Sequence, residues 1–309
     1  MLVSIILPVF NREFFILETL FSIQKQTYSR WECIIVDDGS IDNTFNKTQN
    51  YIKNKKKFKI YHRPNNYPKG ANSCRNYGFE KSKGKLINWF DSDDIMHPEF
   101  IRLKAETFLT NNYDLVLSKT SFFKDNITNI LGKELRTIIS ENIIEDFIML
   151  KSSWYLPDAM WKKSFLKNKQ LFSVKLKKGQ DRDFHIKMLL YKPKIKVLNH
   201  YLTYYRQHEH VITNDYSVNV MKSYAEALND RIDLLCKNNP SRKLKFFLLK
   251  TQTKNYQYLY STKNSFWFFI KVFKKLFVFN LENIVWFIKF ILAVIMFNLF
   301  GKGGLLLKN

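Results

Sequence analysis

The sequence predicts an α/β protein built on a mixed, mostly parallel central sheet flanked by helices, followed by a helical C-terminal region. Over residues 2–118, short apolar runs alternate with segments of helical spacing, which is typical of βαβ units. From residue 263 the chain becomes aromatic and basic, and Asn283 to Phe300 contain one charged residue, Lys289. A length of 309 residues allows one large domain or two smaller ones.

Strands are expected where apolar residues run together and stop at a turn residue, and helices where apolar residues recur every three or four positions. In the first half, the expected strands are 2–10, 31–36, 58–62, 85–90 and 113–118, and the expected helices are 14–26, 71–81 and two that begin near 42 and 98. Beyond residue 125 the pattern weakens. Helices are expected at 140–150, 181–190 and 217–260, with a break at Pro240, and one or two strands at 195–206.

Polar side chains come directly after three of these strands. Asn11 follows the first strand, Asp37 and Asp38 follow the second, and Asp91 to Asp94 follow the fourth. Ligands of such sheets bind in a crevice beyond the carboxyl ends of the strands. The sequence therefore predicts one site to which three strand ends contribute.

The run Asp91-Ser92-Asp93-Asp94 presents closely spaced carboxylates, the hard oxygen donors that Mg²⁺ and Mn²⁺ prefer. The alternative is a solvated acidic loop in which one aspartate caps the helix that begins near Pro98. The run follows the apolar strand 86–90 in a chain of net charge +23, and that setting favours a site.

Two further segments contain candidate ligand contacts. Asp38 can accept hydrogen bonds from a nucleobase or a ribose, whereas Gly39 and Ser40 are interpreted as turn residues. Arg75, in the first turns of a helix, could face a diphosphate. Ordinary helix capping explains Gly70 near this arginine equally well.

Five segments, in this order, resemble glycosyltransferase family 2, whose members are inverting enzymes of the GT-A fold. They are Val3–Asn11, Ser22–Tyr28, Ile34–Ser40, Arg75–Gly78 and Asp91–Asp94. The resemblance is almost continuous over residues 2–118. It implies a GT-A catalytic domain at 1–215, with a nucleotide-binding half at 1–118 and an acceptor-binding half at 119–215, before a helical region at 216–309.

The resemblance also implies roles for individual residues. The nucleotide sugar would contact Pro8, Phe10, Glu13, Asp38, Arg75, Asp91, Ser92 and Arg206. A divalent cation, Mn²⁺ or Mg²⁺, would bind at Asp91, Asp93, Asp94 and His208, although an exposed histidine with no metal role is the alternative for His208.

The segment Gly179–Phe184 resembles the family motif that contains the catalytic base. Asp181 aligns with that base, and Asp183 remains the alternative. Gln180 stands where the family usually has an acid. Either aspartate could instead serve as the capping acid of the helix that follows.

The resemblance implies transfer of a sugar from a nucleoside-diphosphate sugar, with a UDP-sugar favoured, to a hydroxyl of a glycan or lipid-linked glycan. The process would be cell-surface polysaccharide or lipopolysaccharide biosynthesis. A nucleotidyltransferase of related fold is a second class, but Pro8–Arg12 is not the Gly-rich triphosphate loop that it needs. A basic nucleic-acid-binding protein is a third class, and we expect no nucleic-acid partner because base-stacking or groove-reading motifs are missing.

The charge is concentrated near the end of the sequence. From Cys236 onward there are 13 basic residues and one acidic residue, Glu282. Aromatic residues stand there in apolar blocks such as 266–270, which suits an anionic inner leaflet. We expect a peripheral or monotopic protein on the cytoplasmic side of the inner membrane. A single C-terminal span is one alternative, and a buried hairpin or oligomer interface is another.

Overall fold

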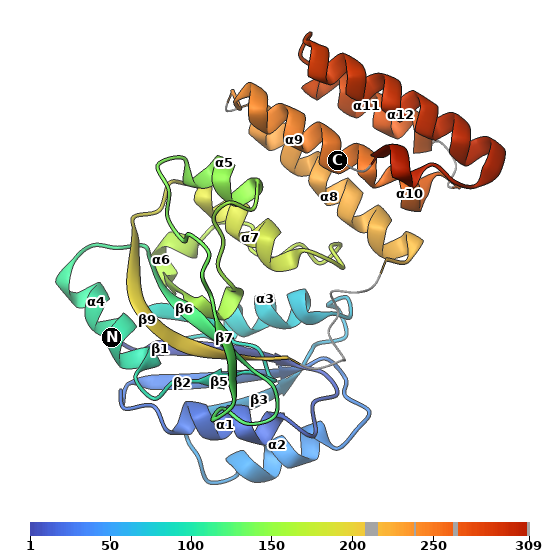
Figure 1. The fold of residues 1–309 in the computed structure, drawn as a ribbon. Helices are drawn as coiled ribbons and strands as arrows, with labels where there is room; N and C mark the ends of the chain where they lie inside the picture. The colour runs from blue at the N-terminus through green and yellow to red at the C-terminus, as the bar shows by residue number, and fades with distance from the viewer. Residues whose placement is uncertain (208–215, 238, 262–264, 308–309) are drawn as a thin grey trace. The chain divides into compact units, whose positions relative to one another are not determined.

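The computed structural model describes residues 1–207, 216–237, 239–261 and 265–307. The chain divides into two compact units (Figure 1). The first comprises Met1–Val174 and Gln180–His210, and the second comprises Lys175–Gly179 and Val211–Asn309. The first unit is an α/β fold, and the second is a bundle of helices.

A nine-stranded sheet forms the centre of the first unit, in the order β3-β2-β1-β4-β8-β6-β9-β5, with β7 paired to β6. Neighbours among β1 to β4 run parallel, as do β6 and β9, while β8 runs antiparallel between β4 and β6. The expected mixed sheet flanked by helices is confirmed. The strands are β1 Val3–Val9, β2 Trp31–Asp37, β3 Phe58–His62, β4 Leu86–Trp89, β5 Ile95–Met96, β6 Leu115–Phe123, β7 Ile130–Lys133, β8 Ala159–Lys162 and β9 Ile195–Arg206.

Helices cover both faces of the sheet (Figure 1). Alternate residues of β1, such as Ile5 and Leu7, share a buried cluster with Leu20 of α1 and Phe100 of α4. Ile6, between them, points to the opposite face and lies against Gly78 of α3. The helices of this unit are α1 Ile16–Gln24, α2 Thr44–Ile52, α3 Ala71–Lys81, α4 Phe100–Thr110, α5 Ile143–Ile148, α6 Lys163–Leu166 and α7 Gln180–Leu189, with a 3-10 turn, η1, at Leu156–Asp158.

The parallel register places the ends of three strands at one edge of the sheet. Val9, the last residue of β1, pairs with Asp37, the last residue of β2. Trp89, at the end of β4, pairs with Ile6 of β1. The loops that carry the polar clusters therefore leave the sheet side by side.

The second unit consists of helices whose apolar side chains meet one another. Phe290 of the last helix contacts the rings of Tyr256, Phe269 and Phe273. The Ser241 side chain accepts the N–H of Leu244 at 3.1 Å and caps the helix that follows the expected break. The helices are α8 Val218–Cys236, α9 Arg242–Lys254, α10 Tyr256–Leu259, α11 Ser265–Leu276 and α12 Leu281–Phe300, with a 3-10 turn, η3, at Gly304–Leu307.

Candidate active site

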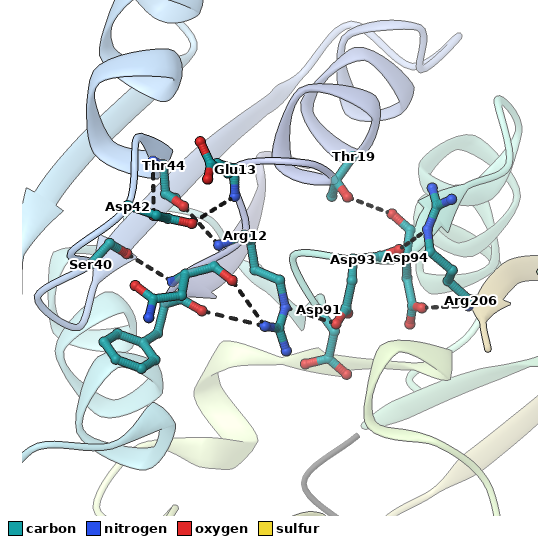
Figure 2. A network of polar contacts seen from close by, with 12 residues as sticks. Arg12, Glu13, Thr19, Ser40, Asp42, Thr44, Asp91, Asp93, Asp94 and Arg206 are labelled. Atoms are coloured by element: carbon teal, nitrogen blue, oxygen red, sulfur yellow. Dashed lines mark hydrogen bonds and ion pairs between the residues drawn. The ribbon is translucent and has the colours of Figure 1, made fainter. Parts of the chain in front are cut away.

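Hydrogen bonds fasten the turn after β1 to the turn after β2 (Figure 2). The N–H of Asn11 donates to Ser40 Oγ at 3.0 Å, and the N–H of Ile41 donates to Asn11 Oδ1 at 3.0 Å. The N–H of Arg12 donates to Thr44 Oγ1 at 2.7 Å. Asn11 has a φ of 50°, a left-handed conformation that asparagine tolerates. The backbone that presents Arg12 is therefore held in place.

The two aspartates at the end of β2 make different contacts. Asp37 Oδ2 accepts the N–H groups of Gly39 and Ser40, each at 3.0 Å, and so shapes the turn. Gly39 has a φ of 84°, which favours glycine. Asp38, the predicted nucleotide contact, is buried and instead faces the segment that leads into α3.

Asp38 is held by a residue that the sequence analysis missed. Its Oδ1 accepts the N–H of Gly70 at 3.1 Å and also the Nε–H of Arg63. Arg63 follows β3 directly, and its NH1 also donates to the carbonyl of Tyr67. The only signal for it in the sequence was a single arginine placed at a strand end, like the other polar clusters.

The loop after β4 directs its three carboxylates to different partners. Asp91 Oδ1 accepts from Arg75 at 3.2 Å, and Asp93 Oδ2 accepts from Arg12 Nε at 3.0 Å. Figure 2 shows Arg12 extending from the turn after β1 toward Asp93. Asp94 is 1% exposed, and its Oδ1 accepts a backbone N–H of β9 at 2.9 Å. Arg12 is a second residue that the sequence analysis missed.

Negative charge accumulates around this loop. Burial raises the pKa of Asp91 to about 6; Arg75 opposes this rise, and the nearby Asp181 and Asp93 add to it. Burial, followed by the charges of Asp93 and Asp91, raises the pKa of Asp94 well above its usual range. Burial and neighbouring negative charge thus both oppose ionisation of Asp94, whereas Asp91 and Asp93 each meet an arginine.

Arg75 joins this loop to α7. Arg75 is 6% exposed, and its guanidinium donates to Asp91 Oδ1 and lies 3.5 Å from Asp181 Oδ1. Asn72, one turn earlier on α3, accepts from Arg75 NH1 at 3.3 Å. Because one cation contacts carboxylates from two distant segments, the fold brings the predicted metal run and the predicted base together.

The two candidate bases on α7 differ in exposure and pairing. The Asp181 side chain is 43% exposed, whereas the Asp183 side chain is 6% exposed. Asp183 Oδ2 lies 2.8 Å from Lys187 Nζ, one turn along the same helix. A carboxylate that must take a proton from a substrate has to be reachable, and this geometry favours Asp181.

Arg206 ends β9 and contacts the protein on several sides. It is 4% exposed; NH2 donates to Glu18 at 2.6 Å, Nε to the carbonyl of Asp93 at 2.9 Å, and NH1 to the carbonyl of Asp125 at 3.3 Å. These bonds hold Arg206, a predicted nucleotide-sugar contact, against the acidic loop. His208, the predicted histidine ligand, lies outside the described residues.

The remaining predicted contacts differ in accessibility. Pro8 is buried within β1, and Ser92 is 6% exposed. Glu13 lies 3.6 Å from a lysine of α2. Phe10 is 36% exposed, and Lys69 Nζ lies 4.4 Å from the centroid of its ring. Of these four residues, Phe10 offers the most accessible surface for a planar ligand.

The donor set around Asp91 and Asp93 fits a small divalent cation in its chemistry. Both residues offer carboxylate oxygens. Burial is the main cause of the raised pKa of Asp91, and the nearby charges of Asp181 and Asp93 add to it, so a cation here would offset both effects. Among the described residues, no group of three or more Asp, Glu, His or Cys side chains is arranged to hold a metal ion. A cation here would therefore need oxygen atoms from substrate phosphates and water to complete its coordination.

Comparison with known proteins identifies a family that covers more than half of the chain. Residues 4–190 match the family described as Glycosyl transferase family 2. The chain belongs to that family, and it is a GT-A glycosyltransferase.

Individual relatives cover parts of the chain. One is Escherichia coli WfgD, described as a UDP-Glc:alpha-D-GlcNAc-diphosphoundecaprenol beta-1,3-glucosyltransferase, which is 34% identical over 132 residues. That alignment covers 43% of this chain and 50% of WfgD. An uncharacterized glycosyltransferase of Haemophilus influenzae is 27% identical over 154 residues, covering 50% of this chain and 59% of that protein. The chain thus matches between half and three fifths of the length of these two relatives.

A solved structure shares the fold. The crystal structure of S. aureus TarS 1–349 in complex with UDP-GlcNAc superposes with a TM-score of 0.61 at 20% sequence identity. The superposition covers 96% of this chain and 81% of the TarS chain. At this level of identity, the similarity establishes the fold.

Proposed function

We propose that the protein transfers a sugar from a nucleoside-diphosphate sugar, with a UDP-sugar favoured, to a hydroxyl of a glycan or lipid-linked acceptor, with inversion at the anomeric carbon. The observation that carries the proposal is the placement of Arg75 between Asp91 and Asp181. A leaving diphosphate needs its charge stabilised, and an acceptor hydroxyl needs a base. Groups suited to both tasks lie around one guanidinium.

On the donor side, Asp38 and Phe10 would hold the nucleoside. The buried Asp38 carboxylate can accept hydrogen bonds from a base or ribose, and the partly exposed Phe10 ring can contact a planar group. Arg75, beside Asp91, would face the diphosphate and stabilise the negative charge that develops on it as its bond to the anomeric carbon breaks.

A divalent cation, Mn²⁺ or Mg²⁺, would be held by Asp91 and Asp93, and when bound it would neutralise the departing diphosphate. Asp94 would support this site from the interior, where it accepts a backbone N–H of Arg206. Arg206 would keep the loop in position through its bond to the carbonyl of Asp93.

On the acceptor side, Asp181 would act as the general base. It would accept the proton of the attacking hydroxyl while the oxygen bonds to the anomeric carbon on the face opposite the diphosphate. The attack, the departure of the nucleoside diphosphate and the proton transfer then balance within one inverting displacement. No carboxylate nucleophile of the kind used by retaining glycosidases is required.

The acceptor is proposed to be lipid-linked and presented at the cytoplasmic face of the inner membrane. The relative WfgD is named for an acceptor on diphosphoundecaprenol, and TarS was crystallised with UDP-GlcNAc. Both names support a nucleotide-sugar donor, and the first supports a lipid-linked acceptor in cell-surface polysaccharide biosynthesis. The basic and aromatic composition of the C-terminal region supports the proposal that the enzyme acts at a membrane surface.

A screen of nucleotide sugars for Mn²⁺-dependent release of nucleoside diphosphate tests the proposal. Asp181→Asn should lower kcat by at least about 100-fold with little change in donor affinity, because a general base contributes roughly 10²–10⁴. Asp93→Asn should weaken both metal binding and turnover. Asp183→Asn is the matched control on the same helix and should retain most activity.

The outcome that would overturn the assignment is full turnover in Asp181→Asn together with loss of turnover in Asp183→Asn. Circular dichroism and thermal unfolding would first establish that each variant is folded. Release of nucleoside diphosphate from none of the donors, with folded protein and Mn²⁺ present, would contradict the proposed reaction itself.

A further inference from the structure

Helix α12 has two apolar faces, and the bundle uses one of them. On the inner face, Trp286 Nε1 donates to Thr253 Oγ1 of α9 at 2.9 Å, and Phe290 packs against aromatic rings of α10 and α11. The outer face presents six exposed aliphatic residues: Leu281, Val285, Ile288, Leu292, Ile295 and Leu299. We refer to these six residues as the outer stripe.

The outer stripe is continuous along the whole helix. Its members are spaced by four and three residues in turn, the spacing that places side chains on one helical face. Leu281 is 77% exposed and Leu299 is 68% exposed, so both ends of the stripe are uncovered. Most soluble domains leave apolar side chains exposed singly, and a stripe of this kind indicates a surface that is covered by something else.

The length and composition of α12 would also allow it to cross a membrane. It has 20 residues, about 30 Å of helix, and is the only described helix that is long and apolar enough to span. Its inner face, however, is bound to α9, which contains Arg242, Lys243 and Lys245. Crossing would either draw these charges into hydrocarbon or break the inner contacts. A helix lying in the plane of the surface avoids both penalties.

The positive charge of the neighbouring helix indicates what covers the outer stripe. Helix α11, whose Phe273 ring packs 4.9 Å from that of Phe287 on α12, contains no acidic residue. Its Lys271 and Lys274 are exposed, and its Lys275 pairs with Asp233 of α8 at 2.6 Å. A second copy that covered the same surface would bring like charges together. An anionic bilayer offers the opposite charge to the lysines and hydrocarbon to the stripe.

We propose that the outer stripe inserts into the surface of an anionic bilayer, with α12 parallel to the membrane plane and the α11 lysines at the headgroups. Phe279, 87% exposed in the turn between α11 and α12, enters the interface beside the stripe. This inference rests on the proposed membrane association and specifies its face, depth and lipid charge.

Vesicle binding tests whether the outer stripe is the surface that binds the bilayer. The purified 309-residue protein is mixed with vesicles of phosphatidylcholine alone, or with vesicles in which about 30% of the lipid is the anionic phosphatidylglycerol. Binding should require the anionic lipid. The variant Ile288→Gln/Leu292→Gln/Ile295→Gln should bind at least about tenfold more weakly, because three aliphatic side chains that would enter the bilayer are replaced by polar ones. The matched control replaces three exposed leucines of the catalytic unit by Gln: Leu109, Leu131 and Leu135.

Depth measurements test the orientation. An environment-sensitive fluorophore is attached to Cys introduced singly at Val285, Leu292 or Leu299, in a background where the half-buried Cys236 is Ser. Lipid quenchers placed at known depths should report similar, shallow positions for all three sites. A deep Leu292 with Val285 and Leu299 near opposite surfaces would show a span and overturn the in-plane geometry. Unchanged vesicle binding by the stripe variant would contradict the proposal that the outer stripe binds the bilayer. A stripe-dependent dimer in light scattering would contradict it as well.

Failure of this inference is distinguishable from failure of the proposed reaction. Vesicle binding is repeated with Asp93→Asn, which should bind vesicles normally because Asp93 belongs to the first unit and the outer stripe to the second. Donor hydrolysis is measured without vesicles, where the stripe variant should match the wild type. The two properties are thus read out separately.

Discussion

Two arginines contact different carboxylates of the candidate active site. Arg75 contacts Asp91 and Asp181, and Arg12 contacts Asp93. Without these cations, three carboxylates would crowd one site and repel one another. Arg12 thus occupies the partner position that a divalent cation would take at Asp93, and the two should compete.

In the absence of nucleotide, we expect the Arg12→Gln variant to bind Mn²⁺ about fivefold more tightly than the wild type does. The reason is that a partly exposed ion pair, worth roughly 1 kcal/mol, no longer competes for Asp93. Electron paramagnetic resonance of free Mn²⁺ measures the affinity. Arg102→Gln removes an arginine of α4 that pairs with Glu99, and it should leave the affinity for Mn²⁺ unchanged. Weaker Mn²⁺ binding by Arg12→Gln would contradict the competition.

His185 shows how one buried residue links stability to pH. It is fully buried among the rings of Phe147, Trp154 and Trp161, and neither ring nitrogen has a hydrogen-bond partner within the described residues. Burial, followed by the charge of Arg75, lowers the pKa of His185 from 6.5 to about 3. The unfolded chain therefore takes up the proton first as the pH falls.

Because the folded-state pKa is depressed, this contribution to stability is present above about pH 6.5 and is lost progressively toward pH 3. Between pH 7 and pH 5 the wild type should lose about 2 kcal/mol through His185. Urea unfolding of His185→Phe at both pH values should show a smaller loss by that amount. Equal losses in the two proteins would exclude His185 as the source.

At the scale of elements, α3 positions the site by lying very close to β1. A Cβ at Gly78 would come 2.4 Å from Cγ2 of Ile6, a buried β-branched side chain with little freedom to move. The close approach keeps the N-terminal half of α3, which contains Arg75, beside the strand ends. A small residue at Gly78 therefore serves the position of the arginine as well as the packing.

Gly78→Ala should destabilise the protein by roughly 1–3 kcal/mol, the usual effect of overpacking a core. Chemical unfolding measures the change, and donor affinity should fall as α3 shifts. Gly132→Ala is a suitable control because a Cβ there meets no atom within 4 Å. A neutral Gly78→Ala would mean that α3 and β1 can separate without cost.

Elements with strong local signals were predictable from the sequence. Helix α3 (Ala71–Lys81) and strands β3 (Phe58–His62) and β9 (Ile195–Arg206) have the predicted bounds. Strands β5 and β8, of two and four residues, were not predicted, since such short segments have no periodicity of their own. Their pairing with distant strands makes them strands, and β8 introduces antiparallel neighbours into the sheet.

For the whole molecule, the distribution of charge favours a lipid surface over a nucleic acid as the anionic partner. The chain has a net charge of +23, and from Cys236 onward it has 13 basic residues and one acidic residue. In the second unit, the exposed lysines of α11 share that helix with aromatic and aliphatic side chains, a combination suited to a lipid surface. The charge should therefore act at lipid surfaces.

At 150 mM NaCl, we expect single-stranded RNA and duplex DNA to bind with dissociation constants above about 10⁻⁵ M, the range of nonspecific electrostatic association. Fluorescence anisotropy with labelled oligonucleotides measures this affinity over a salt series. Binding at nanomolar concentration, with a preference for one sequence, would restore a nucleic-acid function. Anionic vesicles in the same buffer provide the positive comparison.

The order of motifs in the sequence was enough to predict the family, the mixed sheet and the strand ends that form the candidate site. It was enough because each strand and turn has a local pattern, and because parallel strands must end at one edge. The tertiary structure decided which carboxylate meets which cation: Arg12 at Asp93, Arg63 at Asp38, and Arg75 between Asp91 and Asp181. These pairs join residues 16 to 106 positions apart, so no local pattern could indicate them. The packing of α12, which covers one apolar face and leaves the other exposed, was decided in the same way.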